Sequence, residues 1–101
     1  MKNRKRPPAH PGALIKRQYI EASGISITSL ADSLKISRKT MSKIVNERSG
    51  ITTDMALRFS AAFNTTPELW LNLQNNYDLW HAINSKGSWK TIKKLELEPV
   101  V

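Results

Sequence analysis

Residues 28–46 read TSLADSLKISRKTMSKIVN and contain the signals for two short helices joined by a tight turn. The first helix, capped by Thr28, is expected to end at Leu34 after about two turns. The second is expected over residues 38–46, with Ser37 as its N-cap. Two short helices at this spacing are typical of a helix-turn-helix motif.

The apolar residues of this stretch lie where the two helices would pack against each other and against a common core. Small Ala31 stands where the helices must approach closely. The other members of this apolar set are Leu30, Leu34, Ile36, Met41 and Ile44. Lys35 departs from the usual motif, which favours Gly at the turn, and a positive φ at Lys would cost about 1 kcal/mol relative to Gly.

The outer face of the second helix carries cationic and hydroxyl side chains, which are the groups that bind phosphates and base edges. This face consists of Arg38, Lys39, Thr40, Ser42 and Lys43. Arg38 and Lys39 lie in the first turn, which points to base edges in this motif, and an Arg there can donate two hydrogen bonds to guanine. A charged helix face can also be simply solvated, but its place within this motif favours a DNA-reading helix.

Helix N-termini are predicted to add contacts to the DNA backbone. Thr28, Ser29 and Thr53 are first of all candidate capping residues. Because the N–H groups of a first helical turn also bind phosphate, these residues join Ser37 in the predicted DNA-binding set.

Helical periodicity on both sides of the motif predicts an all-α fold. Upstream, a helix is expected from Pro11 to Gly24 with one apolar face formed by Ile15, Tyr19 and Ala22. Downstream, a helix over residues 54–63, capped by Thr53, presents Met55, Ala56, Phe59, Ala62 and Phe63.

Asn64 can adopt the left-handed conformation that ends the preceding helix. The last and longest helix is expected after it, up to about Ser85. Thr66 and Pro67 are its start signals. Its stripe of Trp70, Leu73, Tyr77 and Trp80 is more typical of core packing than of a base-stacking platform. Part of this stripe is expected to remain exposed and to pair with a second copy, giving a homodimer on an operator with an inverted repeat.

Composition favours a polyanionic partner and gives no support to an enzyme. Sixteen Lys and Arg against eight Asp and Glu give a net charge of +8, which suits nucleic acid. There is no Cys, and His10 and His81 are far apart; they are assigned to a helix start and a helix surface. We expect no metal, no cofactor and no catalytic residues. Because no apolar run approaches the roughly 20 residues needed to span a bilayer, we expect a cytoplasmic protein.

Three segments are predicted along the chain. Residues 1–10 form a flexible basic arm that is either solvated or in contact with DNA, and residues 11–85 form the helix-turn-helix domain. Residues 86–101 form an extension in which Leu95 and Leu97 alternate with Glu96 and Glu98. This alternation suits a strand added to a partner, but a disordered end is an equal alternative.

Several short stretches together resemble the HigA family of antitoxins, also called virulence-associated protein I homologues, over about residues 8–82. They are HPG at 10–12, LA at 30–31, SRKT at 37–40, IT at 51–52, DMALR at 54–58, WLNLQ at 70–74 and YDLW at 77–80. The chain departs from the family at Lys35 and at residues 46–49, where a Gly-containing turn is usual. The resemblance implies a five-helix fold, a homodimer, repression of its own operon and neutralisation of a RelE-like ribonuclease toxin.

Two functions therefore remain open. One is an antitoxin that represses its own operon and neutralises a RelE-like mRNA-cleaving toxin. The other is a free-standing helix-turn-helix repressor without a toxin. Both use the same DNA-binding residues and differ only in the protein partner.

Overall fold

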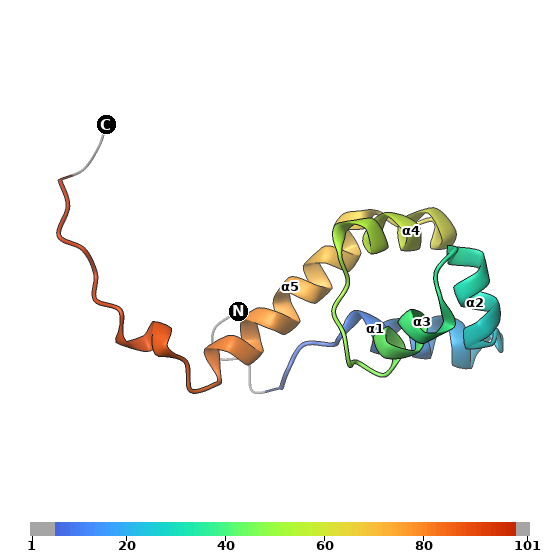
Figure 1. The fold of residues 1–101 in the computed structure, drawn as a ribbon, viewed down its shortest axis with the longest axis horizontal. Coiled ribbons are helices and arrows are strands. Elements are labelled where there is room, and N and C mark those ends of the chain that lie inside the picture. Colours follow the sequence, from blue (N-terminus) through green and yellow to red (C-terminus); the bar gives the residue numbers. More distant parts are fainter. Residues whose placement is uncertain (1–5, 99–101) are drawn as a thin grey trace.

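The computed structural model describes residues 6–98, which form five α-helices and contain no strand (Figure 1). The all-α prediction is confirmed. The α-helices are α1 (Pro11–Ile15), α2 (Ile27–Leu34), α3 (Arg38–Val45), α4 (Thr53–Phe63) and α5 (Pro67–Ile83). A π-helical segment, η1 (Lys16–Glu21), continues α1, and a short 3-10 helix, η2 (Ser88–Thr91), lies in the tail.

The core lies between α1, α2, α3 and α4 and the first half of α5, while the second half of α5 projects away from this body (Figure 1). Phe59 of α4 and Trp70 of α5 are both fully buried, with their ring centroids 5.2 Å apart. The rest of the buried apolar set is Ile15, Leu30, Ala31, Leu34, Met41, Ile44, Val45, Ile51, Met55 and Ala56. All helices therefore contribute to one core.

The first helix departs from the regular α-helix that its periodicity predicts. A π-helical turn holds more residues than an α-helical turn, so η1 rotates the face presented to the core. Ile15 is buried and Tyr19 stacks on Phe63 with centroids 3.9 Å apart, but Ala22 is exposed. The placement of Ala22 on the inner face was wrong for this reason. Gly24, with φ 75°, ends the segment as expected.

The start of α1 is more ordered than the predicted flexible arm. His10 is the N-cap, and its Nδ1 accepts a hydrogen bond from the backbone N–H of Gly12 at 2.9 Å. Pro8 and His10 are both buried, so the arm is shorter than residues 1–10; residues 1–5 of it lie outside the described residues. A Cβ atom at Gly12 would collide with the carbonyl of Ile44, so this Gly allows α1 to approach α3 closely.

Two helices begin earlier than predicted. Ser26, not Thr28, caps α2: its Oγ accepts from the backbone N–H of Ser29 at 3.0 Å, and Ile27, the first residue of the helix, packs against the core. Thr52, not Thr53, caps α4. The predicted caps Ser37 of α3 and Thr66 of α5 are confirmed.

Left-handed residues separate successive helices at the predicted places. Lys35 ends α2 with φ 58°, and Asn64 ends α4 with φ 55°. Glu47 also has a positive φ of 60°, within residues 46–49, where the family resemblance implied a Gly-containing turn. The strain expected at Lys35, about 1 kcal/mol relative to Gly, is therefore present in the turn of the motif.

The C-terminal part shows two further differences from the predictions. Ala62, expected on the inner face of α4, is exposed, and α5 ends at Ile83 rather than Ser85. The tail leaves the body as an extended segment (Figure 1), touching α5 where the Trp89 indole N–H donates to the carbonyl of Ala82 at 3.3 Å. Residues 92–98 contain no strand in this single chain, and the addition of a strand to a partner stays a prediction.

Candidate DNA-binding site

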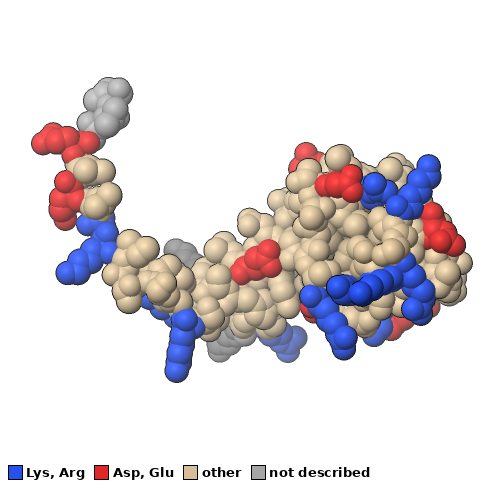
Figure 2. All heavy atoms as spheres, viewed as in Figure 1, with Lys and Arg blue, Asp and Glu red and all other residues tan. Residues whose placement is uncertain are grey.

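The two helices of the motif pack by the predicted apolar residues. Leu30, Ala31 and Leu34 of α2 are buried, as are Met41 and Ile44 of α3. Because the inner face of α3 is used in this way, its cationic and hydroxyl residues are left on the outside. Lys and Arg side chains gather over the part of the body where α3 lies (Figure 2).

Most of the predicted DNA-binding residues are exposed. Two are half-buried, Thr40 and Ser42. The exposed residues are Thr28, Ser29, Ser37, Arg38, Lys39, Lys43 and Thr53. The N-termini of α2 and α3 thus present one hydroxyl-rich and cationic surface, whereas Thr53 belongs to the start of α4.

Arg38 is linked to the N-terminus of α2. Its Nε donates to the Oγ1 of Thr28 at 3.0 Å, a contact between side chains ten residues apart. Because Nε is occupied, the two terminal nitrogens of the guanidinium remain for an outside acceptor. Thr28 does not cap α2, because Ser26 does, and it supports Arg38; its predicted contact with phosphate stays a prediction.

The hydroxyl groups near the start of α3 are partly used within the chain. Ser37 Oγ accepts from the backbone N–H of Thr40 at 3.0 Å and donates to its Oγ1 at 2.9 Å. Ser42 Oγ accepts from the Nδ2 of Asn46 at 3.3 Å. Lys39 and Lys43 are exposed cations on the same helix. Arg38, Lys39 and Lys43 are therefore the groups most available to a ligand.

One residue that bears on the site was missed from the sequence. Arg58 of α4 donates from Nη1 to the carbonyl of Leu34 at 2.9 Å and to that of Lys35 at 3.2 Å, within the turn between α2 and α3. The only sequence signal was the i,i+4 spacing of Asp54 and Arg58, which form an ion pair at 2.8 Å.

The aromatic stripe of α5 is divided between core and surface. Trp70 is fully buried, and its indole N–H donates to Thr65 Oγ1 at 2.7 Å, so it has no surface for a second subunit. Its assignment to a dimer interface is corrected, because its own chain covers it. Leu73, Tyr77 and Trp80 are half-buried.

The described part of the chain holds no group of three or more His, Cys, Asp or Glu side chains placed to bind a metal ion.

Burial lowers the pKa of His10 below its usual value, and the nearby carboxylate of Glu47 and the backbone of Ser49 offset this shift only in part. Among residues 6–98, no helix is long and apolar enough to cross a membrane.

Comparisons with known proteins agree with this geometry. A family model described as helix-turn-helix matches residues 16–70. An uncharacterized HTH-type transcriptional regulator of Haemophilus influenzae is 41% identical over 81 residues, which cover 80% of this chain and 76% of the relative. Antitoxin HigA-1 of Vibrio cholerae is 36% identical over 84 residues, covering 83% of this chain and 79% of its own.

A solved structure extends the agreement to three dimensions. Antitoxin GraA in complex with its operator has a TM-score of 0.82 and 37% identity to this chain, covering 96% of this chain and 99% of that one. Fold and site together thus define a helix-turn-helix DNA-binding protein. Within that class, the chain belongs to the family of HigA-type antitoxins and virulence-associated proteins. The resemblance seen in the sequence is confirmed.

Proposed function

We propose that this protein acts in the cytoplasm as an antitoxin that binds the operator of its own operon and neutralises a RelE-like mRNA-cleaving toxin. The observation that carries the DNA-binding part is the outer face of α3. Arg38, Lys39 and Lys43 are exposed on a helix whose inner face is buried in a helix-turn-helix. Relatives with the same fold support it, because GraA has been solved with its operator.

Arg38 is proposed to read a guanine in the major groove. Thr28 accepts from its Nε, which leaves both terminal nitrogens to donate to guanine O6 and N7. Substitution Arg38→Ala should therefore cost about 1 to 3 kcal/mol on the operator and relax preference at one base pair.

Operator variants at each position, titrated by fluorescence anisotropy, would measure this effect. Lys90→Ala is the matched control, because it removes one exposed cation from the tail. A uniform loss on all sequences for Arg38→Ala would make Arg38 a phosphate contact instead.

A homodimer is proposed to form through the projecting half of α5. Leu73, Tyr77 and Trp80 are half-buried there, and Leu79 and Ile83 keep more than two-fifths of their surface exposed, at 44% and 43%. A second copy would cover these apolar side chains, and two-fold symmetry would match an operator with an inverted repeat.

Light scattering tests this pairing. Leu79→Glu should give a monomer and weaken operator binding together, whereas Asn75→Glu on the same helix should change neither. A wild-type chain that is monomeric at micromolar concentration on DNA without dyad symmetry would contradict the proposal.

The toxin is proposed to bind away from α3, so that DNA and toxin can be held together. The tail is the favoured contact: Glu96 and Glu98 end a segment whose Leu95 and Leu97 are exposed, and its acidic end is visible in Figure 2. An extended segment of this kind can add a strand to a partner sheet, and its carboxylates suit a basic toxin.

Co-expression with the product of the adjacent gene separates antitoxin from free-standing repressor. We expect a stable complex and rescue of growth, and the double variant Arg38→Ala, Lys39→Ala should lose operator binding but keep rescue. If no neighbouring product is toxic or binds this chain, the protein is a repressor without a toxin, as the name of the Haemophilus relative would also allow.

A further inference from the structure

The turn between α2 and α3 is held from outside by a residue of α4. Lys35 ends α2 in the left-handed conformation, which disfavours residues with a side chain. Its own N–H donates to the carbonyls of Ala31 and Asp32, so the backbone of the turn is closed on one side. The carbonyl of Leu34, the last residue of α2, and that of Lys35, the first residue of the turn, point to the other side, toward α4.

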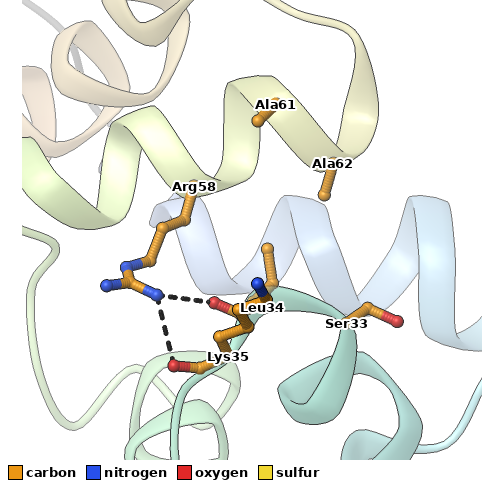
Figure 3. Close-up of a pocket in the computed structure, with 6 residues that line it drawn as sticks. All are labelled: Ser33, Leu34, Lys35, Arg58, Ala61 and Ala62. Atoms are coloured by element: carbon orange, nitrogen blue, oxygen red, sulfur yellow. Dashed lines mark hydrogen bonds between the residues drawn. The ribbon is translucent and has the colours of Figure 1, made fainter.

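Arg58 binds both of these carbonyls. Its Nη1 lies 2.9 Å from the oxygen of Leu34 and 3.2 Å from that of Lys35 (Figure 3). The carbonyl end of a helix carries partial negative charge, so a guanidinium is favoured there electrostatically as well as by hydrogen bonding. The contact joins residues that are 23 and 24 positions apart, and thus ties α4 to the turn.

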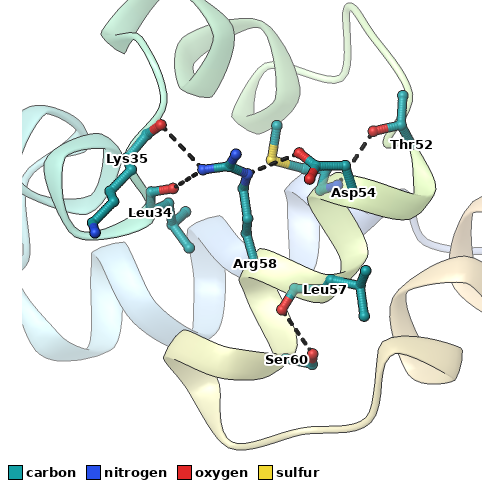
Figure 4. Close-up of polar contacts among 8 residues, drawn as sticks. Leu34, Lys35, Thr52, Asp54, Leu57, Arg58 and Ser60 are labelled. Carbon is teal, nitrogen blue, oxygen red and sulfur yellow. Dashed lines mark hydrogen bonds and ion pairs between the residues drawn. The ribbon is translucent and has the colours of Figure 1, made fainter.

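The guanidinium is itself oriented by a neighbour on α4. Asp54 lies one helical turn before Arg58, and its Oδ2 is 2.8 Å from Nε (Figure 4). Because the group is planar, fixing Nε sets the direction in which Nη1 points. Asp54 and Arg58 thus form a brace that starts on α4 and ends on the backbone of the turn.

We propose that Arg58 is a positioning residue for operator recognition: it holds the left-handed turn at Lys35 and so fixes the angle at which α3 leaves α2. α3 begins at Arg38, three residues after Lys35. A change in the turn would therefore move Arg38 relative to its support Thr28 and to the bases. This inference rests on the proposed operator binding, but assigns specificity to a residue that need not touch DNA.

The test measures affinity for the operator and for a scrambled duplex of equal length, at a temperature where circular dichroism shows each variant folded. Arg58→Met should lower the operator-to-scrambled ratio about tenfold while affinity for scrambled DNA changes less than threefold. The salt dependence of binding should keep its slope, because no phosphate contact is lost. Arg58→Lys should resemble Arg58→Met, since it keeps the charge without the planar group.

Rescue at the turn distinguishes positioning from a general loss of stability. Lys35→Gly relaxes the left-handed residue, so in the Arg58→Met background it should restore most of the lost ratio. Asn64→Gly in the same background relaxes a left-handed residue at the far end of α4, so it is the matched control and should restore nothing. Asp54→Asn gives a milder version of the defect should Arg58→Met fail to fold.

Two results would overturn the proposal. One is an equal loss on both duplexes with a salt slope reduced by about one unit, which would make Arg58 a phosphate contact. The other is an operator-to-scrambled affinity ratio that is unchanged in Arg58→Met, Arg58→Lys and Asp54→Asn. If the wild-type chain shows no operator preference, the proposed function fails instead. The brace is then tested directly by the NMR signals of the backbone amides of residues 35–40. Arg58→Met should shift these signals, and unshifted signals would overturn the positioning role of Arg58.

Discussion

The helix-turn-helix and the tail treat their apolar residues in opposite ways. In α2 and α3 the large apolar side chains point into a shared core, and side-chain contacts from α4 hold the turn between them. In the tail, Ile92, Leu95 and Leu97 are 78%, 72% and 76% exposed. The apolar residues of the motif are thus buried within one chain. Those of the tail have no apolar partner within the described residues, and we expect a second molecule to cover them.

The largest expected contrast between the two regions is in stability. Phe59→Ala removes a fully buried ring and should lower the free energy of unfolding by about 3 to 5 kcal/mol. Leu95→Ala in the tail should change it by less than about 0.5 kcal/mol. Urea denaturation followed by circular dichroism measures both. A comparable loss for Leu95→Ala would show that the tail packs on the domain.

A smaller effect is expected where α1 meets α3. Gly12→Ala places a methyl group against the carbonyl of Ile44, and the resulting backbone shift should cost about 1 to 3 kcal/mol. Gly24→Ala is the comparison, because a methyl group there meets open space and only the positive φ is penalised, by about 1 kcal/mol. Thermal unfolding of the two variants should rank them in this order, and a reversed ranking would contradict the close approach of α1.

Stability should also depend on pH through His10. Its pKa is lowered in the folded state, chiefly by burial, so the folded state binds its proton less readily than the unfolded state. Stability is then full above the unfolded pKa of about 6.5 and falls as pH decreases through and below that value. Urea denaturation at pH 7.5 and pH 5.5 measures the loss. His10→Asn keeps a capping acceptor without a titratable ring and should weaken this dependence; an unchanged dependence would exclude His10 as its source.

The smallest stability effect belongs to the tail as a whole. Deleting residues 86–101 should change the free energy of unfolding by less than about 0.5 kcal/mol and leave operator binding intact. The same deletion should abolish rescue from the toxin if the tail is the toxin contact. Growth rescue that survives the deletion would move that contact to another surface, such as the first helix and arm.

The sequence predicts those features that have local causes. The start of α3 at Ser37, the start of α5 at Thr66 and the left-handed Asn64 all follow from short-range chemistry. Helix starts with several capping residues in a row were not predicted correctly. Thr52 and Thr53 are equivalent locally, and the choice between them accompanies a long-range contact, in which the N–H of buried Ile51 donates to Gln74 at 3.0 Å.

Other features depend on contacts that no local pattern reveals. The π-helical turn at Lys16–Glu21 changes which residues of the first helix face the core. Trp70 belongs to the core because Phe59 and Phe63 of α4 surround it, although its spacing on α5 is equally suited to an interface. The brace from Arg58 to the turn of the motif spans more than twenty residues. The sequence therefore predicts which side chains α3 exposes, but it does not predict the contact from Arg58 that holds the turn before α3.

The most direct test of the central claim is the affinity of the purified protein for the DNA upstream of its own gene and for a scrambled duplex, measured from 50 to 200 mM salt. We expect binding to the upstream DNA to be at least about 10³ times tighter than to the scrambled duplex at physiological salt, with affinity for both duplexes falling steeply as salt rises. Arg38→Ala, Lys39→Ala should remove the preference. Equal affinity of the wild-type protein for the two duplexes would contradict a DNA-reading role for α3.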